Sequence, residues 1–250
     1  TGLTEELNSM RQLPAVQECL VPALRHLRQA NGACPLLADV HCGIAKLSWV
    51  EVEPTEDQLH VERARWLAPS DPTMLFVCGL LDLHAGRMAD AFAGWKRSLT
   101  LSRQHLEQVL ALTSSYLAAD GMVEQILPDS PAMLLDLAKS RFIESQSQAT
   151  RDALVRRAAF LIDLDGGNES HRLQAKVMAL QGELERAISE FQLAVRLDPR
   201  NADLRHEFAE TLWQAGHLDE ARQQAAWSAR LAPQHRRHQR LLTQIRNAGR

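Results

Sequence analysis

The chain has 250 residues and a net charge of −3, with 45% apolar and 24% charged residues. This mixture is typical of a folded globular protein, and it excludes disordered and fibrous chains as well as a global bias towards nucleic acid. The longest apolar stretch, residues 74–83, is about half the length that a bilayer span needs. The first residue is Thr1 rather than Met, so we expect a segment of a longer protein.

Residues 1–34 are predicted to form one or two N-terminal cap helices. The four cysteines all lie in the first third of the chain, and none belongs to a Cys-x-x-Cys pair: Cys19, Cys34, Cys42 and Cys78. We expect free thiols packed on helices in a reducing compartment, with a disulfide as the alternative. Cys34, His41 and Cys42 lack a fourth ligand at a fixed spacing, so no metal site is predicted.

Residues 35–103 are predicted to form two helix-turn-helix repeats. The second starts at Pro72 and carries regularly spaced landmarks: Gly79, Gly86, Ala91, Trp95, Ser98 and Leu101. The first is degenerate and keeps only some of them: Ala45, Ala64, Leu67 and Pro69. Pro54 stands there in place of the usual turn glycine.

Residues 104–167 span about two further periods and are predicted to hold degenerate repeats. Residues 131–165 have the apolar spacing of a helical pair. One helix would present Leu134, Leu137 and Ala138, and the other Leu154, Ala158 and Leu161. The segment 105–128 is shorter and less regular.

Residues 168–235 contain the two clearest repeats. Each landmark of the first recurs 34 positions later: Ala175 with Ala209, Gly182 with Gly216, Ala187 with Ala221, and Pro199 with Pro233. This order of small residue, turn glycine, alanine and terminating proline resembles the tetratricopeptide repeat. The resemblance implies an all-α, right-handed superhelical array of about six helix-turn-helix repeats plus caps. We expect one domain over residues 1–250, closed by a cap helix at 236–250.

In tetratricopeptide repeats the first helices line a concave groove, and the resemblance assigns ligand-facing positions in this chain. The assigned residues are Phe76, Leu80, Leu83, His84, Arg172, Lys176, His206, Glu210, Trp213 and Gln214. The groove would be apolar towards its N-terminal part and of mixed charge towards its C-terminal part, which suits a peptide or an amphipathic helix. The alternative for Phe76, Leu80 and Leu83 is packing against an adjacent helix.

Trp213 is the best candidate for a binding hot spot, because a groove-facing tryptophan offers a large area and a hydrogen-bond donor. Arg172 and Lys176 are followed in the next repeat by Glu207 and Glu210. These glutamates would repel a terminal carboxylate, so a carboxylate-binding clamp is not expected.

The C-terminal end is strongly basic. After Glu220 there is no acidic residue, and there are seven arginines: Arg222, Arg230, Arg236, Arg237, Arg240, Arg246 and Arg250. The basic end could contact anionic lipid, nucleic acid or an acidic partner. The favoured interpretation is a solvated cap whose arginines balance the helix dipole and the acidic body. Nucleic acid is disfavoured, because no aromatic residue lies in the terminal helix to stack on bases.

Signatures of enzymes and cofactor sites are incomplete. His206-Glu207 is followed four positions after the histidine by Glu210 rather than by a second histidine, so the zinc-protease pattern is broken. His235 and His238 share a helix face, but flanking arginines disfavour a cation. A glycine-rich phosphate loop and a nucleophile elbow are both missing. We therefore expect no enzyme activity, no cofactor, no metal and no small-molecule substrate.

A more specific similarity covers about residues 34–233. Its landmarks are Cys-Pro-Leu-Leu-Ala-Asp-Val-His from Cys34, Arg-Trp-Leu-Ala-Pro-Ser-Asp-Pro from Arg65, Gly-Leu-Leu-Asp-Leu-His-Ala-Gly from Gly79, and Ile-Leu-Pro-Asp-Ser-Pro from Ile126. The order resembles the soluble repeat region of bacterial O-antigen ligase or polymerase-like membrane proteins. The resemblance implies that catalytic residues lie in a membrane part outside this chain.

Two functional hypotheses follow. The first is a non-catalytic scaffold that binds a protein or peptide in its concave groove, as the soluble module of a cell-envelope polysaccharide assembly protein. The second is a free-standing cytoplasmic regulator whose basic C-terminal helix contacts anionic membrane or RNA. The expected location is the cytoplasm, with a membrane tether through a segment outside the chain under the first hypothesis.

Overall fold

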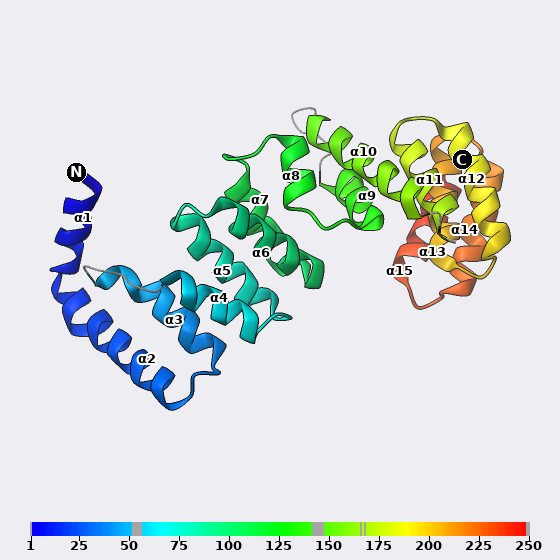
Figure 1. Ribbon diagram of the computed structural model, residues 1–250. Coiled ribbons are helices and arrows are strands. Elements are labelled where there is room, and N and C mark those ends of the chain that lie inside the picture. The colour runs from blue at the N-terminus through cyan, green and yellow to red at the C-terminus, as the bar shows by residue number, and fades with distance from the viewer. Residues whose placement is uncertain (1, 52–56, 142–147, 166, 168, 249–250) are drawn as a thin grey trace. The chain divides into compact units, whose positions relative to one another are not determined.

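The computed structural model describes residues 2–51, 57–141, 148–165, 167 and 169–248. These residues form helices and turns, and they contain no β-strand. Their contacts divide the chain into two compact units, Thr1–Pro128 (unit 1) and Asp129–Arg250 (unit 2). Figure 1 shows that each unit is a succession of helices, most of them in antiparallel pairs. The predicted all-α array of helix-turn-helix repeats is confirmed, and the single domain over 1–250 stays a prediction.

Unit 1 contains the N-terminal helices, two regular helix pairs and a short irregular segment. The N-terminal elements are α1 (Gly2–Arg11), the π-helical turn η1 (Val16–Leu20) and α2 (Val21–Ala33). The pairs are α3 (Ala38–Leu47) with α4 (Asp57–Leu67), and α5 (Pro72–His84) with α6 (Met88–Leu101). The short turns η2 (Ser48–Val50) and η3 (Arg103–His105) follow α3 and α6.

The segment after η3 is irregular, as its sequence predicts. It holds two short helices, α7 (Leu106–Thr113) and α8 (Ala119–Gln125), where a regular repeat would have two longer ones. With five regular pairs in the described part of the chain, α7 and α8 occupy the place of a sixth. The degenerate turn at Pro54 lies outside the described residues, as does Arg250 at the basic end.

Unit 2 contains three regular helix pairs and one closing helix. The pairs are α9 (Pro131–Ser140) with α10 (Gln148–Asp165), α11 (Ser170–Leu180) with α12 (Leu184–Leu197), and α13 (Ala202–Gln214) with α14 (Leu218–Leu231). The closing helix is α15 (Arg236–Ala248), whose apolar side chains Leu241 and Ile245 are buried in the core of the unit.

Polar side chains set the starts of three first helices. The Asp71 carboxylate accepts hydrogen bonds from the backbone N–H groups of Thr73 at 2.8 Å and Met74 at 3.1 Å, which caps α5. Pro72 takes the first helical position, where an N–H group would have no partner in the helix. Ser130 and Asn201 cap α9 and α13 in the same way.

The turn glycines do what their 34-residue spacing predicts. Gly86, Gly182 and Gly216 have φ angles of 76°, 84° and 87°, in the left-handed region that side chains with a Cβ rarely adopt. Each glycine reverses the chain between the two helices of a pair. The small residues seven positions before two of them, Ala175 and Ala209, are fully buried where the helices of a pair approach each other.

A buried ion-pair network joins the two pairs of unit 1. Asp82 on α5 is only 2% exposed, and its carboxylate is paired with Arg65 of α4 and Arg87 of the following turn. The Arg87 Nε–Asp82 Oδ1 distance is 2.9 Å. Burial of this carboxylate is tolerated because two guanidinium groups compensate its charge.

The cysteines are divided between core and surface. Cys42 and Cys78 are buried in one apolar cluster with Ala45, Val61 and Ala64, and are free thiols. Cys19 and Cys34 are also free but exposed. The expectation that all four pack against helices is therefore wrong for these two, because η1 and the end of α2 leave them on the surface.

The most apolar stretch of the sequence, residues 74–83, lies within α5. This helix has 13 residues, and the buried carboxylate of Asp82 interrupts its run of apolar side chains. Within the described ranges, no helix combines the length and the hydropathy that crossing a bilayer requires.

Candidate functional site

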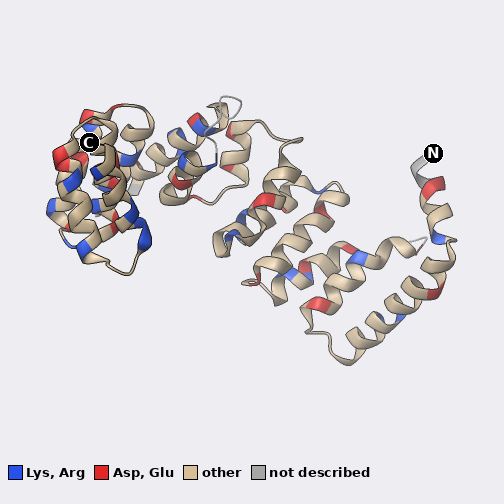
Figure 2. Ribbon diagram, turned by 180° about the vertical axis from the view of Figure 1, so that it is seen from behind, with Lys and Arg blue, Asp and Glu red and all other residues tan. Residues whose placement is uncertain are grey.

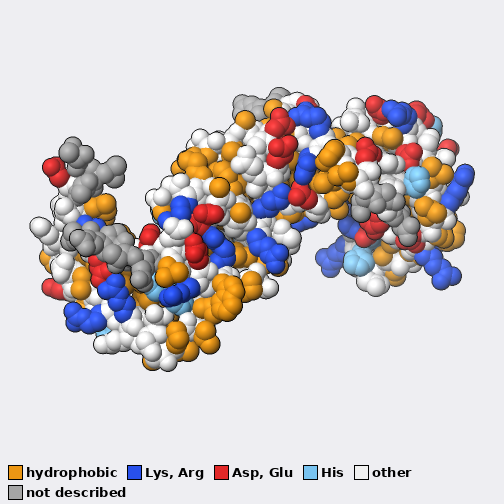
Figure 3. All heavy atoms as spheres, viewed as in Figure 1, with side chains coloured by type: hydrophobic (Ala, Val, Ile, Leu, Met, Phe, Trp, Pro, Cys, Tyr) orange, Lys and Arg blue, Asp and Glu red, His pale blue; other side chains and the backbone are white. Residues whose placement is uncertain are grey.

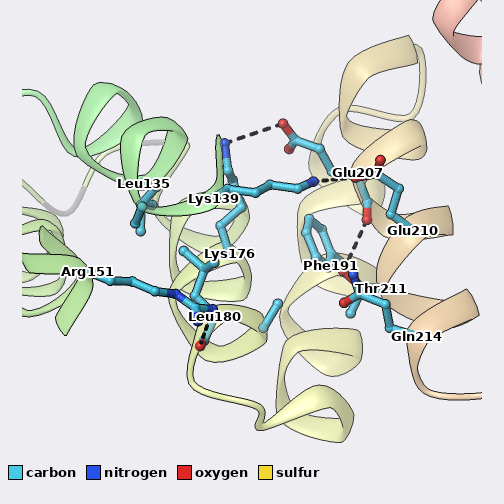
Figure 4. Close-up of a pocket in the computed structure, with 12 residues that line it drawn as sticks. Leu135, Lys139, Arg151, Lys176, Leu180, Phe191, Glu207, Glu210, Thr211 and Gln214 are labelled. Atoms are coloured by element: carbon cyan, nitrogen blue, oxygen red, sulfur yellow. Dashed lines mark hydrogen bonds and ion pairs between the residues drawn. The ribbon is translucent and has the colours of Figure 1, made fainter. Parts of the chain in front are cut away.

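A cavity of about 300 Å³ opens on unit 2 beside the first helices of its pairs. Figure 4 shows side chains from α9 to α13 converging on it. The lining residues are Leu135, Ala138, Lys139, Arg151, Lys176, Ala179, Leu180, Phe191, Glu207, Glu210, Thr211 and Gln214. The cavity therefore combines an apolar interior with charged side chains.

The apolar part of the cavity is rigid because it belongs to the core of the unit. Phe191 of α12 is 1% exposed and stacks on Phe208 of α13, with ring centroids 5.6 Å apart. Leu135 of α9 is fully buried, and Leu180 at the end of α11 is half-buried. A wall anchored in this way keeps its shape when a ligand side chain enters.

Ion pairs form the rim and link three first helices. Lys139 of α9 contacts Glu210 of α13, with Nζ and Oε2 2.5 Å apart. Lys176 of α11 lies 3.1 Å from Asp136 of α9 and 3.5 Å from Glu207 of α13. Figure 4 shows Lys139, Lys176, Glu207 and Glu210 close together at the cavity.

Arg172 of α11 strengthens this rim. It holds Glu207 through two hydrogen bonds, Nε to Oε2 at 2.7 Å and Nη2 to Oε1 at 3.0 Å. This two-pronged bond to Glu207 raises the pKa of Arg172 above its already high ordinary value, against the opposing effect of burial. Glu207 therefore shares its charge between Arg172 and Lys176.

Glu210 has an unusually acidic side chain. Burial alone would raise its pKa, but the hydrogen bonds and charges of His206 and Lys139 outweigh burial and lower the pKa from 4.5 to about 2. The folded state therefore holds this carboxylate ionised at pH values where the unfolded chain binds a proton. Its contribution to stability is complete above pH 4.5 and is lost as the pH falls towards 2.

We expect Glu210→Gln to reduce the acid sensitivity of unit 2. Between pH 6 and pH 3, the free energy of unfolding of unit 2 should fall by about 1–2 kcal/mol less in the variant than in the original chain. Native-state hydrogen exchange of amides in α13 at both pH values measures this difference. Glu220→Gln, at an exposed glutamate of α14, is the control; an equal effect in both variants would contradict the assignment.

A second, more open cavity of about 350 Å³ adjoins the first. It is lined by Lys139, Glu210, Trp213 and Gln214, three of which also line the first cavity. Trp213 is half-buried, and its other face packs against the core cluster of unit 2. We call the residues that line these two cavities the unit-2 groove.

The structure brings together most of the groove residues predicted for the C-terminal part. Lys176, Glu210, Trp213 and Gln214 line the unit-2 groove. Arg172 and His206 border it, where Arg172 holds Glu207 and the Nε2 atom of His206 lies 3.4 Å from Glu210.

Helix α9 also contributes to the groove, which was not predicted from the sequence. Leu135 and Lys139 line the groove, and Asp136 pairs with Lys176 above it. The signal was present: if Ala138 is aligned with the buried alanines Ala175 and Ala209, then Lys139 takes the same repeat position as Lys176 and Glu210.

The four residues predicted for the N-terminal part lie on α5 in unit 1. Phe76 stacks on His105 of η3, with ring centroids 4.3 Å apart and an angle of 5° between the planes. This packing is the alternative that the sequence left open, so one face of the Phe76 ring is already covered. Leu80 and Leu83 are half-buried and His84 is exposed. A role for these four residues in binding stays a prediction.

Ser228, His238 and Asp203 have the order of contacts of a catalytic triad, but their environment is structural. The Ser228 hydroxyl is fully buried and donates to the Ala202 carbonyl at 2.8 Å, so it accepts from His238 Nδ1 at 2.6 Å. Ser98, at the equivalent position of the α5–α6 repeat, makes the same bond to the Pro72 carbonyl without a histidine. Burial, and the neighbouring His206 and Arg237, lower the pKa of His238. The serine joins helices and is not placed as a nucleophile.

The histidines considered as metal ligands have other contacts. The two ring nitrogens of His41 lie 2.7 Å from His60 Nδ1 and 2.8 Å from the Pro35 carbonyl oxygen. The rings of His235 and His238 are edge to face, with centroids 5.9 Å apart. In the part of the chain that the structure describes, no three His, Cys, Asp or Glu side chains are grouped to hold a metal ion.

Comparisons with known proteins agree with the repeat pattern. Residues 178–245, covering most of the last two helix pairs and α15, match the family description Tetratricopeptide repeat. No curated protein gives a significant sequence match.

Solved helical-repeat structures are similar to the chain at low identity. The APC/C hetero-tetramer Cut9-Hcn1 is 14% identical with a TM-score of 0.42, and the match covers 96% of this chain and 48% of that one. The thermophilic TPR protein TTC0263 of Thermus thermophilus is 19% identical with a TM-score of 0.36, and the match covers 91% of this chain and 98% of that one. YrrB, described as a TPR protein with an unusual peptide-binding site, is 15% identical with a TM-score of 0.34. The match covers 86% of this chain and 96% of that one. The chain spans about half the length of the Cut9-Hcn1 chain.

Proposed function

We propose that the chain is a non-catalytic interaction scaffold that binds a peptide or protein segment in the unit-2 groove. The observation that carries this proposal is the juxtaposition of a preformed apolar cavity with a rim of lysines and glutamates from three successive first helices. A volume of about 300 Å³ is at the lower end of the range for small-molecule pockets. It suits one bulky apolar side chain of a peptide, with the rest of the peptide lying along the rim.

The rim favours a ligand of mixed or neutral charge. Lys139, Lys176 and Arg172 each have a carboxylate partner within the groove or at its border. A peptide that brought only an anionic group would have to compete with Glu207 and Glu210 for these cations. This supports the expectation that the groove is not a clamp for a terminal carboxylate, and it makes the apolar anchor the main source of affinity.

Trp213 and Trp227 provide a matched test of this function. We expect a displayed library of random twelve-residue peptides to yield binders whose affinity falls at least tenfold in Trp213→Ala, because this side chain borders the open cavity. Trp227→Ala removes a tryptophan from α14 of the same helix pair and should leave these binders unchanged. Affinities are measured by titration calorimetry. A library that yields no class of binders sensitive to Trp213→Ala or to Lys176→Glu would contradict the proposal.

The resemblance described above supports a finer proposal, in which this scaffold is the soluble module of a cell-envelope polysaccharide (O-antigen) assembly protein. Such a module would be held at the membrane from the cytoplasmic side through a segment outside this chain. An antibody against the chain tests this by fractionation of native cells. A detergent-extracted species much larger than 28.0 kDa supports the proposal, and a species of about that mass in the soluble fraction contradicts it.

The alternative function is a free-standing regulator whose basic C-terminal helix contacts anionic membrane or RNA. The exposed Arg236, Arg240 and Arg246 of α15 favour it. However, Leu241 and Ile245 are buried in the core, so α15 has no apolar face left to insert into a bilayer. Salt-sensitive binding to anionic vesicles or RNA that is lost on truncation after Pro233 would support this alternative.

A further inference from the structure

Trp227 is an exposed aromatic side chain with two guanidinium groups near its ring. It lies on α14, on the second helix of its pair, and is 45% exposed. The Cζ atoms of Arg205 and Arg230 lie 5.5 Å and 5.7 Å from the centre of its ring, within cation–π distance. A single exposed tryptophan is ordinary on a protein surface, so a docking surface here requires further apolar and charged side chains beside Trp227.

Arg205 is itself fixed in place. Its Nε atom donates to the Pro199 carbonyl at 2.8 Å and its Nη1 atom donates to Gln224 Oε1 at 2.7 Å. The guanidinium therefore joins the α12–α13 connection to α14, directly beside the indole of Trp227. Because the guanidinium beside the indole is held at two points, we expect Trp227 to lose little conformational entropy when a partner binds.

Two exposed leucines end the second helices of the same two repeats. Leu197 of α12 is 64% exposed and Leu231 of α14 is 38% exposed. They occupy the same repeat position, 34 residues apart, at the two connections that lead to α13 and α15. Arg205 bridges from Pro199, two residues after Leu197, to Trp227, so Leu197 and Trp227 belong to one edge of unit 2.

Arginines surround these apolar side chains. Arg237 at the start of α15 is paired with Asp203 at the start of α13, which draws the two connections together. We call this surface the outer edge of unit 2; it comprises Arg196, Leu197, Asp198, Arg200, Asp203, Arg205, Trp227, Arg230, Leu231, Arg236 and Arg237. Its six arginines outnumber its two aspartates. One of those, Asp198, accepts a hydrogen bond from Asn201, and the other is engaged by Arg237.

The figures show the same mixture of side chains. Lys and Arg positions are frequent on the C-terminal helices in Figure 2. In Figure 3, hydrophobic side chains lie beside Lys and Arg side chains on the part of unit 2 where α12 and α14 run. This surface is formed by the ends of α12 and α14, the connection after α12 and the starts of α13 and α15. None of its residues lines the unit-2 groove.

The composition of the outer edge distinguishes among anionic partners. Residues 177–250 contain no lysine, and the edge combines arginine with tryptophan. Protein interfaces are enriched in these two residue types and depleted in lysine, whereas lysine and arginine attract anionic lipid about equally. Exposed leucines gain nothing from phosphates or stacked bases. The edge therefore fits a protein surface better than a bilayer or a nucleic acid.

We propose that the outer edge of unit 2 is a second docking surface, which binds an acidic protein segment bearing at least one large apolar side chain. The apolar side chain would pack on Trp227 and the leucines. Carboxylates beside it would meet the edge arginines that have no carboxylate partner among the described residues: Arg196, Arg200, Arg230, Arg236 and Arg205, which is bonded to the Pro199 carbonyl and Gln224 instead. Because the groove and the edge share no residue, one partner could occupy each.

Selection from the same displayed peptide library tests this proposal on the full chain. We expect a second class of binders that contain Asp or Glu next to Leu, Phe or Trp. Their affinity should fall at least tenfold in Trp227→Ala and in Arg230→Glu, and should be unchanged in Trp213→Ala. Arg246→Glu is the matched charge-reversal control. Arg246 is also an exposed arginine of α15, but it lies about ten residues after Arg236 and Arg237 and outside the edge.

Three results would overturn the proposal. The first is that no class of binders depends on Trp227 and Arg230. The second is that the dependent class is neutral or basic. The third is that the two variants abolish binding to vesicles of phosphatidylcholine and phosphatidylglycerol, or to polyuridylate, while no acidic peptide is selected. If the selection yields no peptides that depend on Trp213, the proposed function is contradicted, and the proposal for the outer edge still stands. Circular dichroism melting of Trp227→Ala and Arg230→Glu checks that both variants still fold.

Discussion

Replacing Asp82 with alanine should lower the free energy of unfolding of unit 1 by about 3 kcal/mol or more. The carboxylate is buried and is the shared partner of Arg65 and Arg87. The Arg65 Nε and Arg87 Nη2 atoms are also buried and have no hydrogen-bond partner among the described residues. Without Asp82, both guanidinium groups would therefore remain largely desolvated with their main acceptor removed. This cost exceeds that of losing an exposed ion pair.

Native-state hydrogen exchange of amides in α5 and α6 measures this loss within unit 1. Asp57→Ala is the control, because Asp57 is 3.9 Å from Arg87 and its side chain is 38% exposed. It should cost less than about 1 kcal/mol. Asp82→Asn preserves the shape and should fall between the two. Equal effects of Asp57→Ala and Asp82→Ala would show that the network does not stabilise unit 1.

Gly79→Ala should destabilise unit 1 by about 2–3 kcal/mol. A Cβ atom at this position would lie 2.4 Å from Nε1 and 2.6 Å from Cδ1 of Trp95. The indole cannot move aside easily, because it is fully buried and its N–H group donates to the Phe76 carbonyl at 3.1 Å. The added methyl group must therefore separate α5 from α6 or force Trp95 from its rotamer.

Gly32→Ala is the matched control, because here the same substitution should raise the stability of unit 1 rather than lower it. Gly32 lies within α2, and a Cβ atom there would meet nothing within 4 Å. Alanine should stabilise this helix by up to about 1 kcal/mol. In the Gly79→Ala background, Trp95→Phe should recover part of the lost stability, because the two changes share one space. If Gly79→Ala leaves the stability of unit 1 as high as Gly32→Ala does, then α5 does not pack closely on the Trp95 indole.

The repeat pattern made the turns and the paired helices predictable. Glycine seven positions after a buried small residue is informative because only glycine readily adopts the positive φ of Gly86, Gly182 and Gly216. The helix pair α9 and α10 was predictable from the spacing of apolar residues alone, and the short, less regular segment 105–128 predicted the irregular α7 and α8. These features depend on residues that are close in sequence.

The contacts that complete the site join residues far apart in sequence, and for that reason they were not predicted. Lys139 meets Glu210 across 71 positions, and α9 stands in a repeat that lacks the turn glycine used to set the register. Asp82 gave no signal of burial, since an aspartate in a helix is usually exposed. Only packing shows that Arg65 and Arg87 surround it.

The unit-2 groove is tested most directly by photo-crosslinking. A peptide selected for dependence on Trp213 carries benzoylphenylalanine at its apolar anchor position, and the crosslinked residues of the chain are identified by mass spectrometry. We expect crosslinks within 135–139, 176–180 and 207–214, the segments that line the groove. Crosslinks confined to unit 1 or to 227–231 would contradict this expectation, since the anchor would then lie outside the groove.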